Sequence, residues 1–242
     1  MSSTTNGPRR LVVLGGSAGI GLAVARRVAA AGADVTLGGR DRQRLDDACR
    51  LIGDTATGIV VDAEDPRSLR AFFGEAGPID DLVITVTRRG GAGPAADLAD
   101  ADLAGAFAGK PIAHLRAIAL ALPTLGEHGS ITLVTAGSAQ SALPGTVGLA
   151  AVNGALEAAV APLAVELAPR RVNAVSPGVI ETEWWSELPD HDRDEMFATF
   201  AQRAPVGRNG TADDVAGAIS ALIGNGFITG VVLPCDGGLR LT

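Results

Sequence analysis

The chain has 242 residues, of which 47% are hydrophobic and 19% charged, a composition typical of a globular domain rather than of a disordered segment. Its formal net charge of −7 argues against a nucleic-acid-binding protein, because phosphate contacts need a basic surface. Two distant cysteines predict no disulfide framework and three scattered histidines predict no metal site, so we expect a cytoplasmic protein.

We expect one domain over residues 1–242, since α/β folds of this length are often single and no Pro/Ser-rich linker divides the chain. Residues 1–9 are expected to form a flexible lead-in, with no apolar stretch of signal-peptide length. No apolar run reaches the roughly eighteen residues that cross a bilayer, and no polybasic stretch favours a membrane surface.

Short apolar runs rich in β-formers alternate with alanine-rich segments of helical period along the chain. In chain order the expected strands are 10–16, 34–39, 57–62, 80–86, 129–135, 171–178 and 230–234. The expected helices are 20–31, 41–52, 66–75, about 99–122, 147–167, 190–201 and 211–223. This alternation is typical of βαβ units and predicts a doubly wound, Rossmann-type α/β fold, with seven mainly parallel strands and helices on both faces.

The first strand runs directly into Gly-Gly-Ser-Ala-Gly-Ile-Gly, residues 15–21, and then into a helix. Glycines at this junction let the backbone turn tightly and approach a pyrophosphate, which the free N–H groups of a helix N-terminus stabilise. Because ligands of such sheets bind beyond the carboxyl ends of the strands, we expect the functional site there.

The spacing Gly15-x-x-x-Gly19-x-Gly21 resembles the short-chain dehydrogenase/reductase family. Asp62 is similar to the adenine-contacting aspartate of that family, and the segments 171–182 and 228–238 resemble its Pro-Gly segment and its C-terminal Asp-Gly-Gly region. The resemblance spans residues 11–238 and implies a dinucleotide site. Its expected members are Gly15, Ser17, Ala18, Gly19, Ile20, Gly21, Arg40, Asp62, Ala63, Thr85, Pro177, Gly178 and Ile180.

The choice of nucleotide is expected to depend on Gly38-Gly39-Arg40, which ends the second strand. A carboxylate there would bind the ribose hydroxyls of NAD, whereas arginine accommodates the phosphate of NADP. No acid precedes Arg40, so the sequence favours NADP(H). The alternative interpretation is that Arg40 is a solvated residue at a helix start.

The resemblance ends at the residues that carry the chemistry of the family, namely a serine, a tyrosine, a lysine four residues later and an asparagine on the preceding helix. The chain has no tyrosine, and matching the family pattern puts Leu149 at the tyrosine position and Asn153 at the lysine position. The serine position holds Ala136, although Ser138 and Thr135 are close enough to replace it if the loop shifts.

Matching the end of the long helix to the family puts Lys110 at the asparagine position, as if lysine and asparagine had been exchanged. A desolvated lysine can act as an acid or a base, so the expected catalytic residues are Lys110, Ser138 and Asn153. In the alternative interpretation Lys110 is a solvated lysine at a helix start. His114 lies one turn later, where Pro111 disturbs the helix, and we expect a packed, hydrogen-bonded histidine.

Residues 181–203 stand where the family has its substrate-binding loop, and they contain both tryptophans. They form either an aromatic lid over a small-molecule ligand or a segment packed on the body or on a neighbouring subunit. The resemblance also implies a homodimer or homotetramer, built through the long helices and the last strand.

Three functions remain open at this stage. The chain is an NADP(H)-dependent oxidoreductase acting on a carbonyl or imine compound with Lys110 as proton donor, a nucleotide-binding sensor without turnover, or a redox-neutral dehydratase, isomerase or cyclase on the same fold. The sequence favours the oxidoreductase.

Overall fold

The computed structural model describes residues 7–242. The expected lead-in over residues 1–9 lies largely outside the described residues. At its end, Arg9 forms an ion pair with the buried Asp81, so this residue is part of the folded domain.

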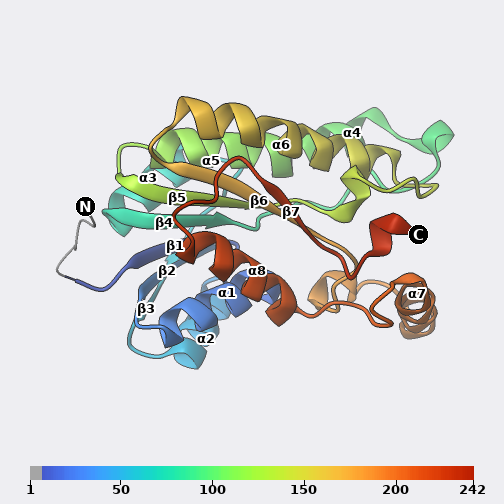
Figure 1. The fold of residues 1–242 in the computed structure, drawn as a ribbon, viewed down its shortest axis with the longest axis horizontal. Helices are drawn as coiled ribbons and strands as arrows, with labels where there is room; N and C mark the ends of the chain where they lie inside the picture. Colours follow the sequence, from blue (N-terminus) through green and yellow to red (C-terminus); the bar gives the residue numbers. More distant parts are fainter. Residues whose placement is uncertain (1–6) are drawn as a thin grey trace.

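Seven strands form a single sheet in the order β3-β2-β1-β4-β5-β6-β7, and every pair of neighbours is parallel (Figure 1). Their bounds are β1 Arg10–Leu14, β2 Asp34–Gly39, β3 Ala56–Val60, β4 Ile79–Ile84, β5 Leu125–Val134, β6 Arg171–Pro177 and β7 Val232–Cys235. The strand order reverses between β1 and β4, which is the point where doubly wound sheets open a crevice for ligands. The expected fold class is therefore confirmed.

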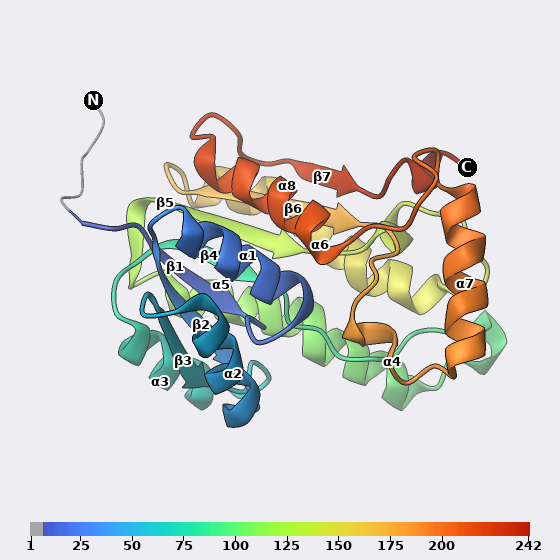
Figure 2. The same ribbon diagram turned by 90° about the horizontal axis from the view of Figure 1, so that it is seen from below.

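Helices cover both faces of the sheet, as Figures 1 and 2 show. On one face lie α1 (Gly19–Ala30), α2 (Arg42–Ile52) and α8 (Ala212–Gly224); on the other lie α3 (Pro66–Ala76), α5 (Ala113–Ala121) and α6 (Val147–Glu166). The helices α4 (Asp100–Phe107) and α7 (Asp190–Arg203) lie toward the carboxyl ends of the strands (Figure 2). Short turns of helix, η1 (Ala95–Asp97), η3 (Gly137–Ala139), η4 (Glu183–Trp185) and η5 (Leu239–Leu241), occur in the loops.

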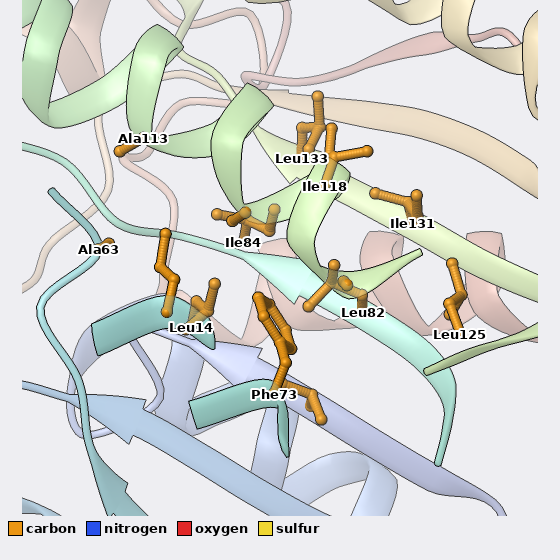
Figure 3. Packing of buried hydrophobic residues seen from close by; sticks show 14 of the residues in the cluster. Leu14, Ala63, Phe73, Leu82, Ile84, Ala113, Ile118, Leu125, Ile131 and Leu133 are labelled. Carbon is orange, nitrogen blue, oxygen red and sulfur yellow. The ribbon is translucent and has the colours of Figure 1, made fainter. Parts of the chain in front are cut away.

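Each face of the sheet has its own apolar core, because parallel strands are buried on both sides. Figure 3 shows the core on the α3 and α5 side, where Phe73 packs among aliphatic side chains that include Leu82 and Ile118. The other core joins β1, β2 and β6 to α1 and α8. These two cores hold the strands rigidly, and the loops at their carboxyl ends are free to form a site.

The segment expected as one helix over about 99–122 contains a change of helical pitch. After α4 the chain passes through a wider π-helical turn, η2 (Ala108–Ile112), before continuing as α5. Pro111 lies in this turn and has no backbone N–H to donate, so the regular hydrogen-bond ladder is interrupted there. Lys110 lies within this interrupted turn.

Among the described helices, α6 is long and apolar enough, by length and composition, to cross a membrane. An unbroken apolar run of that length is still absent from this helix, since Asn153 and Glu157 interrupt it, and its high mean hydropathy comes from the alanine-rich remainder. Its inner face, with Val152, Leu156 and Val160, is buried against the sheet. Helices in the core of globular domains have the same composition.

Candidate functional site

A cleft of about 800 Å³ opens at the carboxyl ends of the strands, around the point where the strand order reverses. Its walls come from the loops after β1, β2, β3, β4, β5 and β6, together with η2, α6 and the segment around η4. The three residues expected to be catalytic and the thirteen expected to bind the cofactor all line this cleft. Side chains far apart in the sequence thus meet in one cavity.

The glycine-rich loop forms one end of the cleft. Gly15 has a φ of 87°, and its N–H donates to Gly38 O at 2.8 Å, so the chain leaves β1 in a tight turn beside β2. A Cβ on Gly21 would lie 2.1 Å from Gly15 O, and a Cβ on Gly15 would lie 2.4 Å from Thr85 Oγ1. The hydroxyl of Thr85 donates toward Leu14 O at 3.0 Å and Gly15 O at 3.1 Å, and so ties β4 to the loop. Only glycine fits at these two positions.

The start of α1 points N–H groups into the same end of the cleft. Ala18 precedes the helix in an extended conformation and has no side chain that can cap it. The first N–H groups of a helix have no intrahelical partner, so an anion is their natural acceptor. Ser17, Gly19 and Ile20 complete this wall.

Arg40 follows β2 and is exposed at the side of the cleft, where it makes no ion pair with any residue among 7–242. Asp62 and Ala63 line the cleft after β3, the strand next to β2, and Asp62 accepts a hydrogen bond from the N–H of Glu64 at 2.9 Å. Near Arg40, Arg44 is paired with Glu183 of η4 at 2.7 Å. A cationic side chain therefore stands at this rim with its charge uncompensated.

The wall that follows β6 contains Pro177, Gly178 and Ile180. The N–H of Gly178 donates to Cys235 O at 3.1 Å, and a Cβ on Gly178 would lie 2.9 Å from the Asp236 Cα. Ile180 is buried and forms a bridge to Gly210. This segment is thus held against the end of β7, where Asp-Gly-Gly begins.

Lys110 lies at the floor of the cleft, in the π-helical turn, and is only 7% exposed. The interpretation as a solvated helix-start lysine is wrong, because the side chain is buried and hydrogen-bonded at the end of β5. Its Nζ donates to Thr135 O at 3.2 Å. Burial lowers the pKa of Lys110 to about 8, an effect that the negative charge of Glu157 partly opposes. Lys110 can therefore exchange a proton near neutral pH.

Ser138 and Asn153 meet in the same part of the cleft. The Asn153 Nδ2 donates to Ser138 Oγ at 3.2 Å and to Leu149 O at 2.8 Å, one turn back on α6. Ala136 is extended, and Ser138 lies in the η3 turn that follows it, in hydrogen-bonding contact with α6; its expected role in place of the family serine stays a prediction. The Oδ1 of Asn153 is buried without a hydrogen-bond partner among the described residues.

His114 is fully buried behind the floor, and its Nε2 donates to Val86 O at 2.9 Å. Burial, together with the nearby positive charge of Lys110, lowers the pKa of His114 to about 3. The histidine is neutral at physiological pH and is packed and hydrogen-bonded, as expected.

Residues 182–187 line the cleft, and both tryptophans belong to them. Trp185 is anchored to the body, since its Nε1 donates to Ile180 O at 2.9 Å and its ring packs edge-on against Phe197 of α7. Trp184 lies 4.9 Å from the guanidinium carbon of Arg89. The two alternatives for residues 181–203 were a lid over the ligand and a segment packed on the body. Each holds in part, because Trp185 packs on α7 while residues 182–187 also line the cleft.

Sequence reasoning missed two features of the site. Arg88 and Arg89 follow β4 and line the mouth of the cleft, where Arg89 is paired with Glu187 at 2.5 Å. Glu157 lies one turn after Asn153 and contacts the floor from behind. Both follow from simple signals: arginines at the carboxyl end of a strand, and residues four apart on one helix face.

Comparisons with known proteins agree with this geometry. The family model described as enoyl-(acyl carrier protein) reductase matches residues 15–240. An uncharacterized oxidoreductase of Mycobacterium tuberculosis is 34% identical over 241 residues, covering 94% of this chain and 90% of that protein. A short-chain dehydrogenase/reductase of Stachybotrys chlorohalonatus is 30% identical and covers 96% of both.

Among solved structures, a small-chain dehydrogenase in complex with NADPH is 31% identical, with a TM-score of 0.83, and the match covers 97% of this chain and 100% of that one. The family match spans nearly the whole chain and includes every element that forms the cleft. The protein belongs to the short-chain dehydrogenase/reductase family.

Proposed function

We propose that the protein is an NADP(H)-dependent oxidoreductase that interconverts an apolar carbonyl or imine compound with its reduced form, and that Lys110 replaces tyrosine as the proton donor. The observation that carries this proposal is the position of Lys110, a buried ammonium at the floor of a cleft whose other end is a glycine-rich loop.

The cleft fits a dinucleotide in its size and in its chemistry. At Gly15 and Gly21 a Cβ would clash with the Thr85 hydroxyl or with the backbone, so only glycine allows this tight loop. The N-terminus of α1 offers unpaired N–H groups to a pyrophosphate. Arg40 is placed for the 2′-phosphate that distinguishes NADP from NAD. The related small-chain dehydrogenase solved with NADPH supports the same choice of nucleotide.

Several large apolar side chains line the cleft away from the glycine loop. Leu149 replaces the phenol of the family, and Leu143, Trp184, Trp185 and Phe200 line the same region. The arginines at the mouth, Arg88 and Arg89, are already paired with Glu64 and Glu187, so a highly charged substrate would find little compensation for its lost hydration, whereas an apolar compound with one carbonyl or imine group would need little. The few polar groups of this region then orient the reacting atom.

When bound, the nicotinamide nucleotide supplies the hydride. Lys110 has one Nζ hydrogen bond to Thr135 O, which leaves N–H bonds to donate to the developing negative charge on the substrate oxygen or nitrogen. Ser138 Oγ accepts a hydrogen bond from Asn153, so its own proton is available for the same substrate atom. The amide of Asn153 thus orients the serine and does not itself transfer a proton.

We also infer that the protein assembles as a homodimer or homotetramer. On α6, Val147 is 55% exposed and Val165 is 81% exposed, and Ile112 and Leu115 on the neighbouring helix are also exposed. Apolar side chains along two adjacent long helices favour contact with a second copy. Light scattering coupled to size-exclusion chromatography gives the mass, and a monomer at micromolar concentration would contradict the inference.

The experiment that tests the proposed activity is the oxidation of NADPH by a panel of apolar ketones, aldehydes and cyclic imines, followed as loss of nicotinamide absorbance. Consumption of NADPH matched by reduced product is the expected result. Product formed without a change in absorbance would favour redox-neutral chemistry, and tight nucleotide binding with no turnover on the whole panel would favour a binding protein.

A further inference from the structure

Lys110 is the only lysine of the chain, since the other nineteen of its twenty basic residues are arginines. It is also buried, and a buried ammonium is costly unless an opposite charge or strong hydrogen bonds compensate it. Its one hydrogen bond among the described residues is to a neutral carbonyl, Thr135 O, at 3.2 Å. The compensating charge must therefore act from further away.

Glu157 on α6 is positioned to provide that charge. Three side chains from separate segments donate to its carboxylate: Thr135 Oγ1 and Ser176 Oγ reach Oε1, and Gln140 Nε2 reaches Oε2, each at 2.9 Å. Three donors from three segments leave the side chain little freedom to rotate. The carboxylate is thus fixed in one orientation.

Thr135 connects Glu157 to Lys110. Its hydroxyl donates to the carboxylate, while its carbonyl accepts the bond from the ammonium, so one residue is held from both sides. The negative charge of Glu157 also raises the pKa of Lys110 against the larger lowering caused by burial. Glu157 itself is not among the residues that line the cleft, so it acts behind the wall and does not contact a ligand.

We propose that Glu157 is a positioning residue for this site: it holds Thr135 in place and balances the Lys110 ammonium, so that the proton stays on Lys110 until the substrate takes it. The inference rests on the proposed role of Lys110 as proton donor. It also explains how a lysine can be buried in η2, because its ammonium needs an anion nearby and Glu157 on α6 provides one.

The other charged or titratable groups around Lys110 do not provide this balance. His114 from α5 is neutral and buried, and it faces the same turn. Arg88 and Glu64 lie beside Gly109, where a Cβ would meet both of them, but they are paired with each other at 3.2 Å and are partly exposed. Thr135, Ser138 and Asn153 carry no charge. Glu157 is the acid on which the charge of Lys110 depends.

The test uses the single lysine as a reporter. Protein labelled with [ε-¹³C]lysine gives one side-chain NMR signal, whose position against pH measures the pKa of Lys110 in the full chain, without substrate or turnover. We expect Glu157→Gln to move the titration of this signal to lower pH, because the carboxylate no longer favours the ammonium. Glu157→Asp, which keeps the charge but shortens the side chain, should titrate between the two and serves if the amide variant does not fold.

The matched control is Glu166→Gln, the same change at an exposed position on the same helix, which should leave the Lys110 titration where it is in the unaltered protein. With an active substrate in hand, the alkaline limb of the pH–rate profile should move in parallel in Glu157→Gln, with turnover at pH 8 reduced about three- to tenfold. An unchanged Lys110 titration in a folded Glu157→Gln protein would overturn the inference. The proposed function fails separately, if Lys110→Met keeps full turnover.

Discussion

The two ends of the cleft differ in how far they follow the family pattern. At the nucleotide end, the glycine loop, Arg40, Asp62 and the Pro-Gly segment, all of which resemble motifs of the family, line the cleft. At the substrate end, matching the sequence to the family motifs leaves none of the serine, tyrosine, lysine and asparagine positions unchanged, and the structure has Lys110 of η2 and Asn153 of α6 in the wall of the cleft. A bound dinucleotide fixes many backbone contacts at once, whereas proton transfer needs only one suitably placed acid, so chemistry can be rebuilt while the binding end stays constant.

The largest effect is expected from a substitution that disables nucleotide binding and leaves the substrate end unchanged. Gly21→Ala places a Cβ 2.1 Å from Gly15 O, which forces the loop away from the α1 N-terminus, and NADPH affinity should fall at least about 100-fold. Calorimetric titration measures the loss. Gly74→Ala, in helix α3 with open space around its Cβ, is the matched control, and binding by Gly21→Ala equal to that of the control would contradict the assignment.

The substrate end can be examined through its pH dependence. Carbonyl reduction needs the protonated form of Lys110, so turnover should be level at lower pH and fall as the pH rises through about 8, approaching tenfold per pH unit. The reverse oxidation needs the neutral amine and should rise over the same range. Steady-state rates at saturating nucleotide test this, and a reduction rate that is flat from pH 7 to 10 would exclude Lys110 as the acid.

The preference for NADPH over NADH is expected to depend on one residue of the nucleotide end, Arg40. Arg40→Ala removes a charge-assisted contact to the 2′-phosphate, and NADPH affinity should fall roughly tenfold or more while NADH affinity stays nearly constant. Titration with both nucleotides distinguishes this from general damage to the fold. Arg50→Ala, on the outer part of α2, is the control, and equal losses for NADPH and NADH would contradict the role of Arg40.

The smallest expected effect is at Ser138. Ser138→Ala removes one neutral hydrogen bond to the reacting atom and leaves Lys110 in place, so turnover should fall about three- to tenfold with little change in nucleotide affinity. A rate equal to that of the unaltered protein would make the serine an ordinary part of the η3 turn.

The nucleotide end was predictable from the sequence because its signals are local. A strand, a glycine turn and a helix start follow each other within Arg10–Gly21, and the same alternation of strand and helix predicted the order of the elements. The substrate end depends on three elements that are distant in sequence, η2, the loop after β5 and α6. The sequence singled out Lys110, Ser138 and Asn153 but left the burial of Lys110 open.

Lys110 lies in the wider turn around Pro111, and no periodicity of apolar residues reports such a change of pitch, so the face on which Lys110 lies could not be read from the sequence. The bond from Lys110 to Thr135 and the cluster around Glu157 likewise join helix to strand across the fold. Contacts of this kind arise only when the sheet has formed, so a single sequence does not reveal them.

The most direct test of the central claim is Lys110→Met, measured for turnover and for NADPH affinity in the same preparation. If Lys110 is the proton donor, turnover falls by at least about 100-fold, the lower range for loss of a general acid, while NADPH affinity changes by less than about twofold. Full turnover in a folded Lys110→Met protein would contradict the claim and leave the proton donor of this site to be sought elsewhere.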